Sequence, residues 1–145
     1  MGLFDFFKPK PKTLYDRLME NPVFQHQQAL FDLQAKMCDG GCTTDELPNG
    51  QSEFGHTPTN PIPTHTVAGS TSYLARLRAP DGAKVVYERR GSLSSETTPQ
   101  PIDAYDISHP DGTHLATIYI SPYQLRNSAK APRGLTLIEP PPNRH

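Results

Sequence analysis

The sequence predicts an α+β fold, in which N-terminal amphipathic helices pack on one face of a small, three- or four-stranded antiparallel sheet. Three observations lead to this prediction. Apolar residues recur at helical spacing between residues 14 and 38. Runs rich in β-forming residues flank two Pro-Asp-Gly turns, at residues 80–82 and 110–112. The sheet that these hairpins build needs cover on one face, and the segment 14–38 is the only amphipathic candidate.

The chain of 145 residues has the length of one domain. We expect an N-terminal arm at 1–12, a single α+β domain at 13–138 and a proline-rich, flexible tail at 139–145. The 16 prolines exceed the ordinary usage of about 5%, and the 34% hydrophobic content is lean. Both facts predict a modest core with long loops. The net charge of −1 creates no field that would favour nucleic acid as a partner.

The N-terminal arm has two interpretations. Its apolar run is interrupted by Asp5 and is too short for a secretory signal or a membrane span. An apolar block is followed by three lysines: Leu3, Phe4, Phe6 and Phe7, then Lys8, Lys10 and Lys12. Such an arm could lie on an anionic membrane, but packing on the domain is favoured, because stable anchoring takes two strong signals. The two cysteines offer no disulfide framework, so we expect a cytoplasmic protein.

Two helices are expected before residue 39. Thr13 and Asp16 form a shortened capping box that starts the first one. Asn21-Pro22 interrupts the pattern and starts the second, because asparagine caps helices well and proline suits the first helical position. Its apolar stripe recurs near heptad spacing: Val23, Leu30, Leu33 and Met37. Gly40-Gly41 ends this helix.

Residues 39–69 form a long loop without a convincing helix or strand. Loops beyond about 12–15 residues are usually functional or disordered. Spaced apolar anchors predict that this one is ordered: Leu47, Phe54, Ile62 and Val67. Asn60 and Ile62 each precede a proline, so residues 60–63 should run extended and enter the sheet at an edge. Because binding residues concentrate on loops held by a scaffold, this loop is the best candidate surface for a partner.

The strands follow the loop. Ser72–Arg78 fits either a short helix or a strand, and the turn at 80–82 favours the strand. Lys84–Arg90 is a clear strand, and residues 92–101 read as a polar loop. Ile102–Ser108 and His114–Ser121 flank the second turn. Most of the buried side chains of the sheet are predicted to be among four residues: Val85, Tyr87, Leu115 and Ile118.

A set of short motifs is spread along residues 44–137. They are Asn49-Gly50-x-x-x-Phe54-Gly55, Asn60-Pro61-Ile62-Pro63, Tyr73-Leu74-x-x-Leu77-Arg78, Arg90-Gly91-Ser92, Pro101-Ile102-Asp103-x-Tyr105, Ser121-Pro122-Tyr123 and Asn127-Ser128-x-Lys130-Ala131-Pro132-x-Gly134. Together these motifs resemble a group of small bacterial proteins of unknown function. The resemblance implies a bacterial protein and no catalytic residue.

Cysteine and histidine residues raise the question of a zinc site. Cys38-x-x-x-Cys42 has the character of a tight ligand pair, and His26, His56 and His65 could add ligands. There is, however, no second cysteine pair and no His-x-x-x-His. Two reduced cysteines at a helix end are therefore the favoured interpretation, with Cys38, Cys42, His56 and His65 as weak metal candidates. No cofactor is expected.

Signals for catalysis are weak. The sequence contains no Gly-x-Ser-x-Gly, no P-loop and no His-Glu-x-x-His. His109, Asp111 and His114 cluster at one turn, but the Pro-Asp-Gly-Thr sequence explains Asp111 as a turn residue. An enzyme needs groups that converge in a pocket, which one turn does not predict.

Four arginines flank the first turn: Arg76, Arg78, Arg89 and Arg90. Gathered together, they could hold a phosphate or a partner's carboxylate through bidentate hydrogen bonds. The favoured alternative is pairing within the sheet to three acidic residues: Glu88, Asp103 and Asp106.

These observations favour a non-enzymatic protein-interaction module of the bacterial cytoplasm. An antitoxin or immunity protein is one subtype, because such proteins are small, soluble and free of catalytic motifs. The alternative is a small enzyme or a zinc-dependent protein that uses the His and Cys residues of the loop. The candidate partner-binding residues are Phe54, Asn60, Ile62, Arg76, Arg78, Arg89 and Arg90. The partner is expected to be another protein rather than nucleic acid or a membrane.

Overall fold

A computed structural model describes residues 13–14, 17 and 20–140 of the chain. The arm at 1–12 and residues 141–145 of the tail lie outside these described residues. The chain divides after Leu33 into two compact units. No helix within the described residues is long and apolar enough to cross a membrane.

Helix α3 spans Pro22–Met37 and begins at the residues that predicted it. The side chain of Asn21 accepts a hydrogen bond from the backbone N–H of Val23 at 2.9 Å, as an N-cap should. The expected second helix is therefore confirmed. None of its residues is buried, and Val23 and Leu33 are 66% and 55% exposed.

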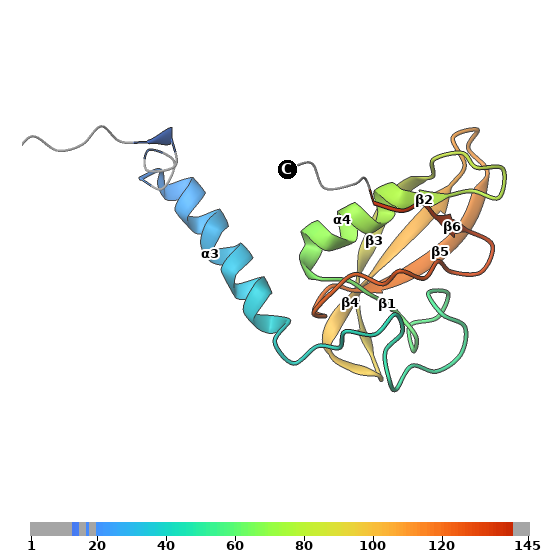
Figure 1. The fold of residues 1–145 in the computed structure, drawn as a ribbon, viewed down its shortest axis with the longest axis horizontal. Coiled ribbons are helices and arrows are strands. Elements are labelled where there is room, and N and C mark those ends of the chain that lie inside the picture. The colour runs from blue at the N-terminus through green and yellow to red at the C-terminus, as the bar shows by residue number, and fades with distance from the viewer. Residues whose placement is uncertain (1–12, 15–16, 18–19, 141–145) are drawn as a thin grey trace, which may run out of the picture. The chain divides into compact units, whose positions relative to one another are not determined.

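The second unit is built on a four-stranded sheet in the order β1-β5-β4-β3 (Figure 1). Its strands are β1 (Ile62–Pro63), β3 (Val86–Ser95), β4 (Thr98–Ser108) and β5 (His114–Ser121). Strand β1 runs parallel to β5, whereas the β4 pairs with β5 and β3 are antiparallel. A smaller antiparallel pair joins β2 (Leu77–Arg78) to β6 (Thr136–Leu137). The predicted α+β class is confirmed.

Helix α4 (Thr66–Arg76) lies over one face of this sheet (Figure 1). It buries Tyr73 and Leu74 in the core, and the Tyr73 hydroxyl donates to the Lys130 carbonyl at 2.6 Å. The strand favoured for Ser72–Arg78 was therefore wrong, because only Leu77 and Arg78 are extended. The turn signal at 80–82 was real, but it closes a short turn after β2, in which the Ala79 N–H donates to the Ala83 carbonyl. The turn at 80–82 therefore does not determine the conformation of the residues before Leu77.

The buried side chains of the sheet come mainly from β4 and β5. Val85 and Ile118 are buried as predicted, but Tyr87 is 36% exposed and Leu115 only partly buried. The buried apolar residues that belong to the two strands are Ile102, Ala104, Tyr105, Ile107, Ile118 and Ile120. The polar loop expected at 92–101 was also wrong, because β3 continues to Ser95 and β4 begins at Thr98. Strand β3 is an edge strand and mostly exposed, so its sequence lacks the alternation that marks a half-buried strand.

The central loop enters the sheet as its prolines predicted. Ile62 and Pro63 form β1 at the edge of the sheet, in register with Ile120 and Ser121 of β5. Phe54 and Ile62 are buried, with 6% and 0% of their surface exposed. Gly55 has a φ of +77°, a conformation that favours glycine. The loop ends earlier than expected, because α4 already begins at Thr66.

Candidate functional site

The central loop is held by a clasp between residues 45–46 and residues 126–130. One carboxylate oxygen of Asp45 accepts from the backbone N–H of Ala129 and from the Arg126 guanidinium, both at 2.9 Å. These contacts, the Ala129 hydrogen bond first, hold the pKa of Asp45 below its ordinary value. Glu46 accepts from the Lys130 ammonium at 2.7 Å. The loop is thereby fixed at a segment more than 80 residues away in sequence.

The tip of the β3–β4 hairpin packs against the same loop. The Ser95 hydroxyl donates to the Pro58 carbonyl at 2.6 Å, and the Asn49 amide donates to the Thr97 carbonyl at 2.8 Å. The loop and the hairpin tip therefore form one continuous wall.

A cleft of about 480 Å³ lies where this wall meets the segment after β5. It is lined by Gly40, Gly41, Cys42, Leu47, Pro48, Asn49, Thr97, Thr98, Pro99, Gln100, Tyr123 and Gln124. The buried Gln124 amide holds two sides of it together: its oxygen accepts from the Cys42 N–H at 2.7 Å and its nitrogen donates to the Ser121 hydroxyl at 3.0 Å. None of the lining side chains is an Asp, Glu, Lys, Arg or His. The cleft is therefore neutral and rich in hydrogen-bonding amides and hydroxyls.

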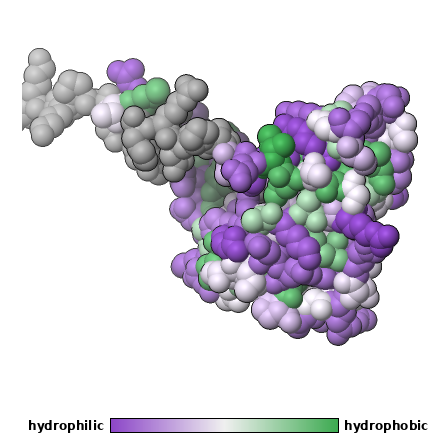
Figure 2. Space-filling model, turned by 45° about the vertical axis from the view of Figure 1, so that its right-hand side comes forward, coloured by the Kyte–Doolittle hydropathy of each residue, from purple (hydrophilic) through white to green (hydrophobic). Residues whose placement is uncertain are grey.

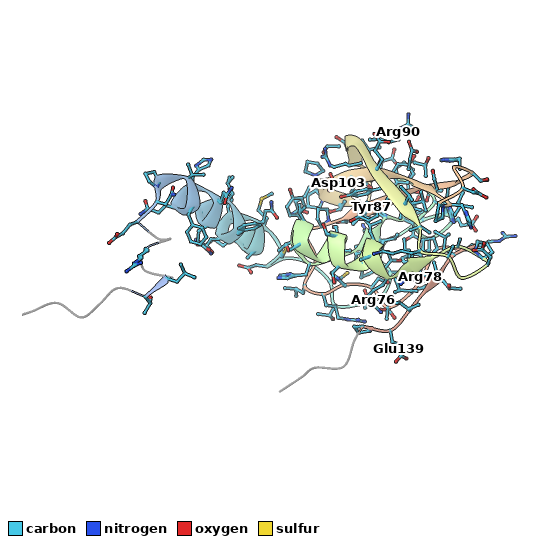
Figure 3. The ribbon with its side chains drawn as sticks, turned by 90° about the horizontal axis from the view of Figure 1, so that it is seen from above. Arg76, Arg78, Tyr87, Arg90, Asp103 and Glu139 are labelled. Carbon is cyan, nitrogen blue, oxygen red and sulfur yellow. The ribbon has the colours of Figure 1, made fainter. Side chains whose placement is uncertain are left out.

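A second exposed feature is the edge strand β3, whose residues are all exposed or half-buried. We call four exposed side chains of this edge strand, which project from both of its faces, the β3 surface: Val86, Tyr87, Arg89 and Arg90. The Tyr87 ring packs edge-to-face on Tyr105, with 6.3 Å between ring centroids. Arg89 pairs with the buried Asp103 at 2.9 Å. Figure 3 shows Tyr87 and Asp103 on the side of β3 that faces α4, and Arg90 on the opposite side. Burial raises the pKa of the Tyr105 hydroxyl, and the negative charge of the nearby Asp103 adds to this.

Three of the loop residues expected to bind a partner are buried. Phe54, Asn60 and Ile62 have 6%, 4% and 0% of their surface exposed. The Asn60 amide donates to the Glu46 carboxylate at 3.2 Å and to the Ser52 carbonyl at 3.0 Å. These side chains hold the loop in place and do not present themselves to a partner, so that expectation needs correction. The sequence predicted Phe54 and Ile62 as apolar anchors of the loop, and their burial follows from that property.

The four arginines do not gather. Arg76 donates to the Ile138 carbonyl at 2.7 Å, and Arg78 donates to the Ala75 carbonyl at 2.9 Å. In Figure 3, Arg76 and Arg78 lie on the other side of α4 from Tyr87 and Arg90. Arg89 and Arg90 pair with Asp103 and Asp106, at 2.9 and 3.4 Å, which is the intramolecular pairing that was favoured.

The weak metal candidates are dispersed. The ring nitrogens of His56 and His65 bond to the carbonyls of Arg133 and Gln124, at 2.8 and 2.9 Å. Cys38 is buried, its thiol lies 3.5 Å from the Pro122 carbonyl, and burial raises the pKa of the thiol. Within the part of the chain that the structure describes, no three His, Cys, Asp or Glu side chains gather in a way that could hold a metal ion.

His109 joins the two Pro-Asp-Gly turns. Its Nε2 lies 2.7 Å from the Asp81 carboxylate, and its Nδ1 accepts from the Asp111 N–H at 3.1 Å. The hydrogen bond to Asp81 raises the pKa of His109, and the nearby Asp111 charge adds to this. Because this contact is exposed and contains no nucleophile, we interpret His109 as a structural link between the two turns and not as a catalytic residue.

This link makes stability depend on pH. The pKa of His109 is higher in the folded than in the unfolded state, so its contribution is present below about pH 6.5 and is lost as pH rises through the folded pKa. We expect Asp81→Asn to lower the free energy of unfolding at about pH 6 more than at about pH 8.5, since asparagine keeps the acceptor for the Ala83 N–H but loses the charge. Urea unfolding at both pH values measures the difference. A pH-independent effect would contradict the assignment to His109.

No family model, no curated protein and no solved structure matches this chain. The site must therefore be interpreted from its geometry. The cleft was not predicted from the sequence, because its lining comes from four separate segments and carries none of the residue patterns that mark catalysis or metal binding. Tyr87 was predicted as a core residue, and only the position of β3 at the edge of the sheet leaves it exposed.

Proposed function

We propose that this protein is a non-enzymatic protein-interaction module and that it binds its partner through the β3 surface. The observation that supports this most is the combination of an exposed edge strand with Tyr and Arg side chains that are already held in position. Tyrosine and arginine are enriched among the residues that dominate binding energy in protein interfaces. A side chain that is already ordered loses less entropy on binding.

Side chains rather than main-chain pairing are expected to make most of this contact. The register between β3 and β4 shifts between Arg89 and Gly91, which marks a β-bulge at Arg90. Bulges interrupt the regular array of hydrogen-bonding groups along an edge and protect it from indiscriminate strand pairing. Because the bulge interrupts main-chain pairing along β3, a partner would be recognised mainly by specific Tyr and Arg contacts. On the coloured part of the face shown in Figure 2, hydrophilic residues cover most of the surface and apolar residues show between them in small groups.

The resemblance to small bacterial proteins motivates a bacterial setting for this module, and the lack of a disulfide framework motivates a cytoplasmic one. An antitoxin or immunity protein that binds and blocks a toxin is a subtype consistent with its size. The alternative, a small enzyme or a zinc-dependent protein using His56, His65, Cys38 and Cys42, has less support, because these side chains face different backbone carbonyls.

Partner capture followed by reconstitution tests the proposal. The full-length protein, immobilised and incubated with an extract of its source cells, should retain a specific partner. The purified protein and partner should then show measurable binding by isothermal titration calorimetry. Tyr87→Ala with Arg90→Ala should weaken that affinity by at least about tenfold, since truncating interface hot spots costs about 2 kcal/mol or more. Arg133→Ala is the matched control, because Arg133 is a surface arginine, 85% exposed, outside β3. Equal affinities for all three proteins, or the absence of a stoichiometric partner, would contradict the proposal.

A further inference from the structure

The neutral cleft under the β3–β4 hairpin tip is separate from the β3 surface and has a role still to be assigned. Its lining residues offer amide, hydroxyl and apolar groups but no formal charge. Burying a charged group in such surroundings would be unfavourable without a compensating charge. An occupant of the cleft should therefore be uncharged where it is enclosed and should both donate and accept hydrogen bonds.

Part of the cleft lining is a stretch of β4 that is not in register with any residue of a neighbouring strand. Strand β4 begins at Thr98, but the residues of β5 pair only with Asp103–Ser108. On the other side, β3 pairs with Thr98 and then with Ile102, across a register shift. Pro99, Gln100 and Pro101 therefore have no residue in register with them on either strand. Main-chain groups in extended conformation that lack a strand partner form a template on which another extended chain can pair.

The two prolines define what this template offers. Proline has no N–H, so Gln100 carries the only backbone donor between Thr98 and Ile102, whereas each residue of the stretch carries a carbonyl acceptor. Neighbouring residues of an extended strand point their N–H and C=O groups to opposite edges, so a partner segment that pairs with Gln100 would accept from its N–H and donate to its carbonyl. The missing donors of the two prolines account for the end of the β4–β5 ladder at Asp103.

We propose that this cleft binds an extended, uncharged segment of a partner polypeptide, whose backbone hydrogen-bonds to that of Gln100 in β4. The cleft is also lined by Tyr123, Gln124 and Gly40, and the buried Gln124 amide is held by hydrogen bonds to the Cys42 N–H and the Ser121 hydroxyl. A Cβ atom on Gly40 would meet no atom within 4 Å, so open space lies next to this residue. The site is independent of the β3 surface and would act whether or not that surface binds a protein.

Gly40 allows the cleft to be obstructed without disturbing the fold. Gly40→Phe should place a ring in this open space and leave the thermal unfolding midpoint unchanged. A random peptide library displayed on phage, selected on the full-length protein, is expected to give peptides with an uncharged core. Synthetic copies of these peptides should bind Gly40→Phe at least about tenfold more weakly. Ser72→Phe, at an exposed position of α4 outside the cleft, is the control that should bind them normally.

A second pair of variants tests the main-chain contact. Gln100→Ala and Gln100→Pro both remove the side-chain amide, but only the proline also removes the backbone N–H. If the N–H is used, Gln100→Pro should bind the selected peptides up to about tenfold more weakly than Gln100→Ala, which corresponds to one hydrogen bond. Equal affinities of the two variants would overturn the proposed main-chain pairing.

Three outcomes of the selection would overturn the proposal as a whole. They are the enrichment of no peptide, the enrichment of peptides with a charged core, and peptides that bind wild type and Gly40→Phe equally. Peptides that lose affinity with Tyr87→Ala but not with Gly40→Phe would bind the β3 surface. That last result would support the proposed function while rejecting the cleft as a peptide site.

Discussion

Replacement of Ile118 by alanine is expected to lower the free energy of unfolding by about 2–5 kcal/mol. Ile118 is completely buried in the core, where it lies opposite Tyr105 on the neighbouring strand. Truncation removes apolar surface from the core and leaves a cavity, and both effects favour the unfolded state. Equilibrium denaturation in urea measures the change directly.

Val86→Ala is the matched control, since Val86 is also a β-branched residue of the sheet but is 54% exposed on the edge strand. Its truncation should cost well under about 1 kcal/mol. If Ile118→Ala proves as mild as Val86→Ala, the face of β5 that is buried has been assigned wrongly.

Gly41→Ala is expected to destabilise the fold by about 3 kcal/mol, at the upper end of the usual cost of overpacking. A Cβ atom on Gly41 would lie 2.6 Å from the Gln124 Cα and 2.7 Å from the Tyr123 carbonyl oxygen. Both neighbours are backbone atoms, so no side-chain rotation relieves the overlap. The shift would also strain the hydrogen bond from Cys42 to Gln124 that holds the wall of the cleft.

The adjacent glycine supplies the control for this prediction. Gly40→Ala adds the same methyl group one residue away, where no atom lies within 4 Å, and should change stability by less than about 0.5 kcal/mol. Denaturant midpoints of the two variants distinguish a packing requirement at Gly41 from a general need for flexibility. Similar losses in both variants would contradict the packing explanation.

Local chemistry accounts for the elements that were predicted well. The start of α3 at Asn21-Pro22 depends on capping by the Asn21 side chain, which acts over two residues. The edge strand at 62–63 depends on prolines that restrict their own backbone and that of the residue before them. The second hairpin depends on Pro110-Asp111-Gly112 between two β-rich runs. Each of these signals is contained within a few neighbouring residues.

Contacts between distant segments account for what was predicted wrongly or missed. Residues 72–76 are helical because Tyr73 and Leu74 pack in the core with residues from β4 and β5, although their local sequence fits a strand as well. The extension of β3 to Ser95 depends on pairing with β4, since residues 91–95 are glycine and serine apart from Leu93 and do not predict a strand by themselves.

The sequence by itself determined the α+β class, the helix start at Asn21, the turns and the edge position of residues 62–63, because short-range sterics and capping act on neighbours. Only the tertiary structure decided that Asn60 is buried, that Tyr87 and Arg89 stand exposed at an open edge, and that four segments enclose a neutral cleft. The physical reason is that the burial of a side chain depends on which other residues pack against it. In this chain the opposite residue is often more than 50 positions away, as the bonds of Asp45 to Arg126 and of Tyr73 to Lys130 illustrate.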